Sequence, residues 1–245
     1  MRVLRNDPPL ARQTGDPKYV SLEDLYDCDF ITIHTPLTRE GPDRTFHLAD
    51  SGFFASLKWD AVLLNASRGA VIETGALKSA IQAGRLRAVA LDVWEGEPNM
   101  DTDLLEMVDL ATPHIAGYSY DGKIGGMIMI YRSLCEHFGL EPRFDASDFL
   151  PEPTVPRLEV AAAKCGDQEV VSEAVEGVYD IRIDDRNLRE IRRQPDGERG
   201  RFFDALRKNY PVRREFQNTT VVLDEPRERL RATLEGVGFQ IGQGG

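Results

Sequence analysis

The stretch from residue 61 to residue 92 reads AVLLNASRGAVIETGALKSAIQAGRLRAVALD. It begins with a continuous apolar run up to Asn65, which is typical of a strand buried on both faces of a parallel sheet. Residues 74–83 have helical periodicity and stop at Gly84, after which residues 87–92 form a second apolar run. A strand, a helix and a strand in this order predict a parallel βαβ unit.

The same alternation continues on both sides of this unit. Further strands are expected at residues 30–34 and 108–112, and helical segments at residues 21–26, 47–54 and 103–107. The chain opens on residues 1–7, which also read as a strand. The pattern therefore predicts an α/β fold, with a partial doubly wound, Rossmann-type parallel sheet over residues 1–120.

The remainder of the chain predicts a long helix, a linker and a second domain. Apolar residues recur at near-helical spacing between residues 122 and 138, and four prolines then mark a linker at residues 141–156. Two more strands and three helices follow. We therefore divide the chain into residues 1–120, a helix at 121–140, the linker at 141–156 and a smaller α+β domain at 157–245.

Composition excludes several classes of function. The 245 residues carry a formal net charge of -11, whereas binding to nucleic acid normally needs clustered Lys and Arg. No window approaches the roughly 18 uninterrupted apolar residues of a membrane span, so no membrane partner is expected. The three cysteines lack metal-ligand spacing, and no cluster of His and carboxylates has it either. We expect a cytoplasmic protein without a bound metal.

Three polar residues follow apolar runs in the order Arg68, Glu97 and His114. Since the strands of a parallel sheet end at one edge, these side chains are expected to share one crevice. Arg68 could clamp a substrate carboxylate, although a surface arginine at a strand end is the simpler interpretation. His114 could act as an acid and base if a carboxylate raises its proton affinity, with Glu97 or Glu95 as that partner.

Asp7 is the candidate for cofactor binding. It follows the first expected strand, where a dinucleotide-binding fold places the acid that accepts hydrogen bonds from the adenosine ribose. A carboxylate there repels a 2′-phosphate, so NAD is favoured over NADP. The alternative is a turn aspartate that caps Asp-Pro-Pro. Asp92, at the end of another strand, is placed to meet the nicotinamide end. The three histidines other than His114 are interpreted as structural.

These residues resemble the D-isomer-specific 2-hydroxyacid dehydrogenase family. The resemblance rests on the motifs Asp7-Pro-Pro, His34-Thr35-Pro-Leu-Thr-Arg-Glu-Gly-Pro, Thr45-Phe-His-Leu-Ala-Asp50, Asn65-Ala-Ser-Arg68-Gly-Ala-Val, Leu91-Asp-Val-Trp-Glu-Gly-Glu-Pro98 and Pro113-His-Ile-Ala-Gly-Tyr118. It implies that Arg68, Glu97 and His114 are catalytic, with His114 the proton donor. It also implies that NAD is contacted by Asp7, Thr35, Ala66, Ser67, Arg68, Asp92 and Gly117, and the substrate by Tyr118.

The C-terminal part narrows the resemblance to one branch of the family. Residues 179–185 and 206–215 are similar to an additional dimerisation domain of that branch, which implies a homodimer and a phosphorylated 2-hydroxy acid as the small-molecule substrate. The family's substrate-binding lobe, first Rossmann strand and Gly-rich pyrophosphate loop have no counterpart here. We therefore expect an N-terminally truncated chain that does not turn over substrate alone, with the apolar stripe of residues 122–138 exposed where the lobe would pack. The alternatives are a dehydrogenase for another 2-hydroxy acid and a non-catalytic dimerisation or binding module.

Overall fold

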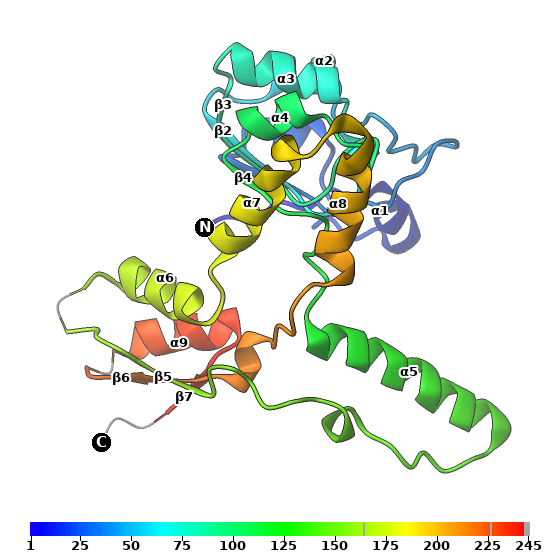
Figure 1. The fold of residues 1–245 in the computed structure, drawn as a ribbon. Coiled ribbons are helices and arrows are strands. Elements are labelled where there is room, and N and C mark those ends of the chain that lie inside the picture. The colour runs from blue at the N-terminus through cyan, green and yellow to red at the C-terminus, as the bar shows by residue number, and fades with distance from the viewer. Residues whose placement is uncertain (164, 226, 243–245) are drawn as a thin grey trace. The chain divides into compact units, whose positions relative to one another are not determined.

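The structure, a computed structural model, describes residues 1–163, 165–225 and 227–242. Over this range the chain forms two compact units (Figure 1). The first unit comprises Met1–Ile115 and Asp184–Asn209, and the second comprises Ala116–Ile183 and the described chain from Tyr210 onward. Each unit therefore contains two separate segments of the sequence.

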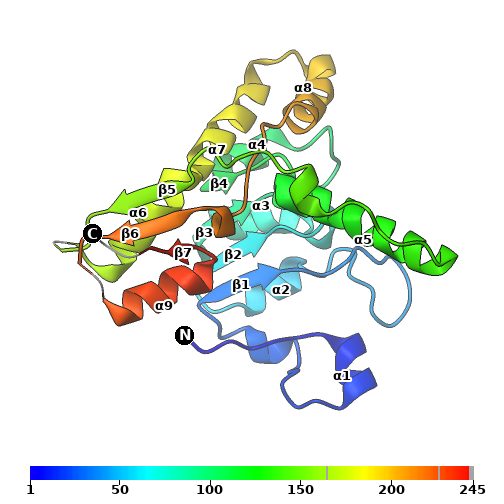
Figure 2. The same cartoon turned by 90° about the horizontal axis from the view of Figure 1, so that it is seen from below.

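The first unit is built on a parallel sheet. Its strands are β1 (Phe30–Ile33), β2 (Ala61–Asn65), β3 (Leu86–Leu91) and β4 (Leu110–Ala111), hydrogen-bonded in the order β1-β2-β3-β4 (Figure 2). Each pair runs parallel, and Asn65 at the end of β2 lies opposite Leu91 at the end of β3. The α/β fold with a parallel sheet is thus confirmed, and the strand ends point to one edge.

In the part of the chain that the structure describes, five helices contribute buried residues to the hydrophobic core around this sheet. They are α2 (Ser51–Ser56), α3 (Thr74–Gln82), α4 (Thr102–Met107), most of α7 (Ile181–Arg189) and α8 (Asp196–Lys208), whereas α1 (Pro8–Thr14) of the same unit has no buried residue. Leu63 of β2, Leu77 of α3 and Leu105 of α4 are fully buried. None of the described helices has the length and apolar content needed to cross a membrane.

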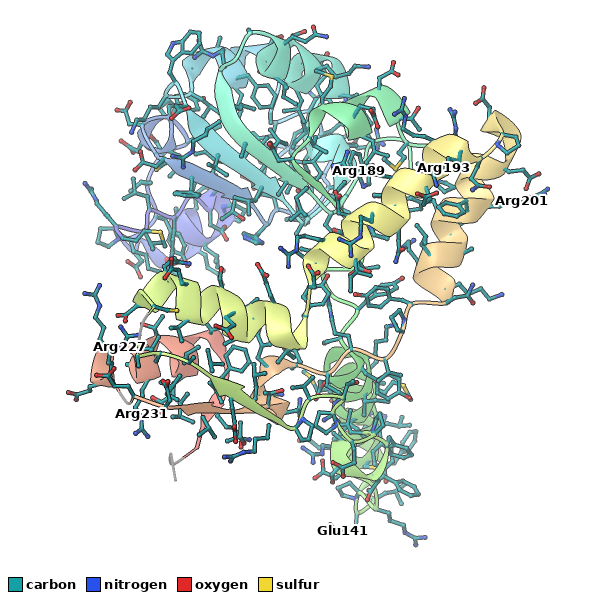
Figure 3. The ribbon with its side chains drawn as sticks, turned by 60° about the vertical axis from the view of Figure 1, so that its left-hand side comes forward. Glu141, Arg189, Arg193, Arg201, Arg227 and Arg231 are labelled. Carbon is teal, nitrogen blue, oxygen red and sulfur yellow. The ribbon has the colours of Figure 1, made fainter. Side chains whose placement is uncertain are left out.

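Residues 184–209 pack with the first unit, which differs from the division at residue 157 that the sequence indicated. Leu188, Ile191 and Phe203 are fully buried in the same core as the sheet residues. Arg189, labelled on its helix in Figure 3, reinforces this packing. Its guanidinium donates to the carbonyl oxygens of Leu105 (2.8 Å) and Val108 (3.0 Å) at the end of α4. It satisfies carbonyls that a helix end leaves without intrahelical partners.

Three local expectations were wrong. Residues 1–4 form no strand within the described chain, and only Arg5 makes a bridge, to Tyr19. The segment 21–26 forms only a 3₁₀ turn at Glu23–Leu25, because such short helices are marginal. The expected helix at 47–54 starts later, as α2, because His47 has a left-handed backbone (φ 54°) and Asp50 caps the helix through the Phe53 N–H.

The second unit contains a smaller parallel sheet. Within the described residues its strands are β5 (Arg157–Val160), β6 (Thr220–Leu223) and β7 (Gln240–Ile241), in the order β5-β6-β7. Helices α6 (Asp167–Val178) and α9 (Glu228–Val237) pack against it through buried residues that include Val170, Ala174, Leu230 and Leu234.

Helix α5 (Tyr120–Phe138) also belongs to the second unit, and a largely buried ion pair fixes its first turn. Arg214 donates from Nε and Nη2 to the two carboxylate oxygens of Asp121, at 2.9 and 3.1 Å. Asn218 Nδ2 and the Glu215 N–H also donate to that carboxylate. Burial raises the pKa of Asp121, but the hydrogen bonds from Arg214, Glu215 and Asn218 outweigh it, so the pKa is lowered on balance.

The Asp121 pair should stabilise the second unit in a pH-dependent way. We expect Asp121→Asn to lower the free energy of unfolding at pH 7 by about 3 kcal/mol, because it leaves the Arg214 charge buried without its partner. Since the folded pKa of Asp121 is depressed, its contribution is present above the unfolded pKa of about 4 and is lost as the pH falls through the folded pKa. Urea unfolding of both proteins at pH 7 and below pH 4 measures the difference.

The exposed pair between Arg182 and Glu176 provides the control. Glu176→Gln should change the free energy of unfolding by less than about 1 kcal/mol at either pH. An Asp121→Asn effect that is as small as the control, or one that does not shrink in acid, would contradict the assignment.

Candidate active site

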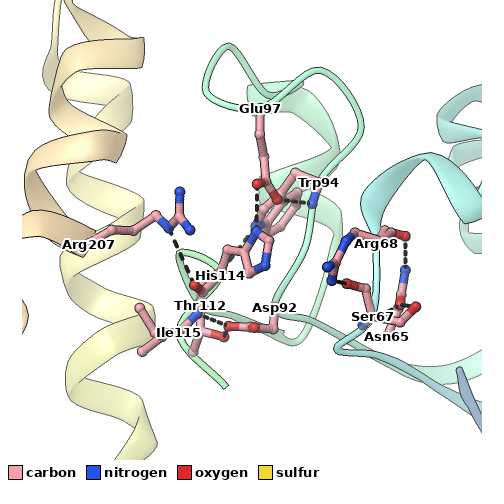
Figure 4. A network of polar contacts seen from close by, with 10 residues as sticks. All are labelled: Asn65, Ser67, Arg68, Asp92, Trp94, Glu97, Thr112, His114, Ile115 and Arg207. Atoms are coloured by element: carbon pink, nitrogen blue, oxygen red, sulfur yellow. Dashed lines mark hydrogen bonds and ion pairs between the residues drawn. The ribbon is translucent and has the colours of Figure 1, made fainter. Parts of the chain in front are cut away.

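The loops that follow β2, β3 and β4 carry the three residues expected to be catalytic. Arg68 lies three residues beyond β2, Glu97 six residues beyond β3 and His114 three residues beyond β4. Because these strands are parallel neighbours, their carboxyl ends meet at one edge of the sheet. Figure 4 shows the side chains on the loops of that edge.

His114 is paired with Glu97, and not with Glu95. The Nδ1 atom of His114 lies 2.8 Å from Oε2 of Glu97, while Oε1 of Glu97 accepts a hydrogen bond of 2.7 Å from the Trp94 N–H (Figure 4). Glu95 instead contacts Nε2 of His47 at 2.5 Å. The geometry therefore selects between the two carboxylates that the sequence left open.

The buried carboxylate of Asp92 sets the backbone around His114. Its Oδ1 accepts hydrogen bonds from Thr112 Oγ1 (2.6 Å) and the Ile115 N–H (2.8 Å). The carbonyl oxygen of Asp92 accepts the His114 N–H at 2.6 Å. His114 has a left-handed backbone (φ 55°), which is uncommon for a residue with a Cβ and is found preferentially at functional sites.

Arg68 lies on a turn that is held by its own neighbours. Asn65 accepts hydrogen bonds through Oδ1 from the Ser67 N–H (3.0 Å) and Oγ (2.8 Å), and donates through Nδ2 to the Arg68 carbonyl oxygen (3.1 Å). The guanidinium donates to the Ser67 carbonyl oxygen at 2.6 Å. Arg68 is exposed, whereas Asn65 and Ser67 are buried. A fixed turn thus presents an accessible cation.

Two residues that the sequence analysis did not single out connect these loops. Gly69 lies so close to the next loop that a Cβ would be 1.9 Å from the carbonyl carbon of Trp94 and 2.1 Å from its oxygen. Trp94 is buried, and its indole N–H donates to the Thr112 carbonyl oxygen at 3.0 Å. The signals available in the sequence were a glycine directly after Arg68 and an aromatic residue between Asp92 and Glu95.

The residues expected to touch NAD fall into both units. Thr35 follows β1 by two residues, and its buried Oγ1 has no hydrogen-bond partner within the described chain, as fits a site where a bound group supplies one. Asp7 accepts the Leu10 N–H through Oδ1 (3.0 Å), so it does cap α1, and it remains partly exposed. Gly117 belongs to the second unit.

Tyr118, the expected substrate contact, also lies in the second unit. Its ring packs edge-on against that of Tyr210, with centroids 6.0 Å apart, and Lys123 Nζ lies 4.1 Å from its centroid. The edge formed by the carboxyl ends of β1 to β4 holds seven of the expected site residues, which are Thr35, Ala66, Ser67, Arg68, Asp92, Glu97 and His114. No cluster of three potential metal ligands occurs among the residues that the structure describes.

Replacement of Gly69 should disturb the site far more than replacement of a nearby glycine. We expect Gly69→Ala to lower the free energy of unfolding by about 3 kcal/mol, because its Cβ would collide with the Trp94 backbone. Gly75, on α3, has nothing within 4 Å of its Cβ position, so Gly75→Ala should stabilise by about 0.5–1 kcal/mol. Chemical denaturation of both variants tests this, and equal effects would refute the close contact.

Comparison with known proteins identifies relatives of this chain. Residues 1–116 match the family described as D-isomer specific 2-hydroxyacid dehydrogenase, NAD binding domain, and residues 149–238 match a family described only as a domain of unknown function. The erythronate-4-phosphate dehydrogenase of Marinobacter nauticus is 40% identical over 237 residues, and that of Cellvibrio japonicus is 42% identical over 237 residues. Each alignment covers 96% of this chain and 62% of the relative.

A solved structure of NAD-dependent formate dehydrogenase from Staphylococcus aureus, in complex with NAD, is 28% identical with a TM-score of 0.45, and the match covers 58% of this chain and 43% of that chain. The chain spans about three fifths of the length of the curated relatives that it matches. Residues 1–116 thus match the NAD-binding domain of the D-isomer-specific 2-hydroxyacid dehydrogenase family, and the sequence is related over nearly its whole length to enzymes named erythronate-4-phosphate dehydrogenase.

Proposed function

We propose that this chain carries the NAD-binding and proton-transfer residues for oxidation of 4-phospho-D-erythronate to 2-oxo-3-hydroxy-4-phosphobutanoate, a cytoplasmic reaction that leads toward pyridoxal 5′-phosphate. The observation that carries the proposal is the His114–Glu97 pair at the sheet edge, beside the loop that holds Arg68. A histidine fixed by a carboxylate, together with an accessible cation, is what hydride transfer at a 2-hydroxy acid requires.

His114 serves as the base in this scheme. The Glu97 carboxylate accepts the Nδ1–H hydrogen bond, which fixes the orientation of the ring and leaves Nε2 to take the proton of the substrate 2-hydroxyl. In the reverse direction Nε2 returns the proton to the keto oxygen. Bound NAD supplies the hydride acceptor. Because the Glu97 carboxylate is itself held by the Trp94 N–H, the ring has one preferred position.

Arg68 binds the substrate carboxylate in this scheme. A guanidinium presents two parallel N–H donors that match the two oxygens of a carboxylate, and its charge persists at any physiological pH. In this scheme Asp7 accepts hydrogen bonds from the hydroxyls of the adenosine ribose, and Asp92 meets the nicotinamide end of the bound NAD. Thr35, Ala66, Ser67 and Gly117 complete the proposed NAD contacts.

The phosphorylated substrate is proposed from the names of the relatives and from Tyr118. Two relatives at about 40% identity are named for erythronate 4-phosphate, and each alignment covers 96% of this chain. A homodimer formed through the C-terminal residues is part of the same proposal. Ile183 and Val212, which line a cavity of the second unit, are about half exposed and are candidates for such an interface.

Turnover by a completed enzyme tests the proposal. The relatives are longer, so we expect the 245 residues alone to be inactive and a fusion with the N-terminal segment of the Marinobacter relative to oxidise 4-phosphoerythronate. In the fusion, His114→Ala should reduce kcat by about 100-fold or more while NAD affinity is retained. Arg68→Ala should raise KM by about 100-fold, since it removes a bidentate ion pair.

A panel of 2-hydroxy acids without phosphate provides the control for substrate class. If an unphosphorylated 2-hydroxy acid is turned over faster than 4-phosphoerythronate, that acid replaces 4-phosphoerythronate as the proposed substrate. Wild-type turnover by the His114→Ala fusion would reject the mechanism. A folded fusion that binds no NAD and oxidises none of the acids would favour a non-catalytic binding module.

A further inference from the structure

Glu95 lies on the same loop as Glu97 and forms a second histidine–carboxylate pair, with His47. Glu95 accepts a hydrogen bond from His47 at its Oε1 (2.5 Å), and its Oε2 accepts the Thr74 N–H at the start of α3 (3.2 Å). The two side chains are less than one third exposed. Burial raises the pKa of Glu95, but the hydrogen bonds from His47 and Thr74 outweigh it and lower the pKa on balance. The carboxylate is therefore held as a charged acceptor between two elements.

His47 is joined in turn to the residues that follow Arg68. Its backbone N–H donates to the carbonyl oxygen of Ala70 at 2.9 Å, and the Ala49 N–H donates to that of Val71 at 3.0 Å. The backbone of His47 is left-handed (φ 54°). A single residue thus contacts the Arg68 turn through its backbone and the Glu97 loop through its side chain.

Glu95 is also at the point where the two loops touch directly. A Cβ on Gly69 would lie 2.4 Å from the Glu95 N atom, so these backbones are in contact with no side chain between them. Hydrogen bonds that link the two loops stabilise such a contact. The Glu95 carboxylate, bound to His47 and to Thr74, does this on one side.

We propose that Glu95 and His47 are positioning residues, which clamp the turn that carries Arg68 onto the loop that carries Glu97. The clamp keeps the substrate-binding cation and the His114–Glu97 pair in one fixed geometry. This inference rests on the roles given to Arg68 and His114 under the proposed function. The clamp itself is a property of the folded chain and can be tested without substrate.

Hydrogen exchange of the 245-residue chain, followed by NMR, tests the clamp. The reporters are the amides of His47, Val71 and Ile72, which donate within the Arg68 turn or to it. We expect exchange at these amides to be about tenfold faster in Glu95→Ala and in His47→Asn, because each loses the hydrogen bond that joins the two side chains. Asparagine is chosen because it tolerates a left-handed backbone.

Matched variants separate the clamp from a general loss of stability. Lys78→Met removes another ion pair of α3, with Asp101 at 2.9 Å, and should leave the reporter amides within about twofold of the wild type. Glu95→Gln keeps oxygen and nitrogen atoms that can hydrogen-bond to Thr74 and His47, so it should restore slow exchange. The effects of Glu95→Ala and His47→Asn should be non-additive in the double variant, since both break one contact.

The second readout is the NMR order parameter of the Arg68 side chain, measured from relaxation of its Nε nucleus. A general structural role for Glu95 would not change this order parameter. The order parameter should fall in Glu95→Ala and stay unchanged in Lys78→Met. If Glu95→Ala behaves like Lys78→Met, or if Glu95→Gln exchanges as fast as Glu95→Ala, the clamp is rejected. Either result would leave the roles of Arg68 and His114 intact, because those are tested separately by turnover of the fusion.

Discussion

The position of His114 depends on the buried carboxylate of Asp92. This residue directly follows the central strand β3, and its side chain and backbone both hold the turn that contains His114. Burial of a carboxylate without hydrogen-bond donors would cost free energy of folding. The Thr112 hydroxyl and the Ile115 N–H supply these donors, so Asp92 and the turn stabilise each other. The ring can then meet Glu97 only where that turn places it, at the edge shared with the Arg68 loop.

The chemistry-bearing residues were predictable because each follows an apolar run. The runs at residues 61–65 and 87–92 become β2 and β3 with little change of boundary, and Asn65 and Asp92 fall where the chain leaves the sheet. What could not be predicted is which acid meets which histidine. Glu95 and Glu97 are two residues apart on one loop, and only the folded path of that loop sends one to His47 and the other to His114.

The failures of prediction have a common physical cause, which is tertiary context. Residues 1–4 have a strand-like composition but lack a ladder partner within the described chain, and Asp7 then starts a helix. The helix at 181–189 was missed because its many charged residues hide the few that are buried. Leu188 and Ile191 can be recognised as core residues only when the sheet against which they pack is known.

The interleaved course of the chain has a consequence for synthesis on the ribosome. The core of the first unit includes Leu188, Ile191 and Phe203, yet residues 116–183 are made before any of these. Part of the apolar surface of the first unit's sheet therefore stays uncovered while most of the second unit is synthesised. Truncation anywhere before residue 203 leaves that surface open, so a cut between residues 115 and 116 would not release a first domain with a complete core.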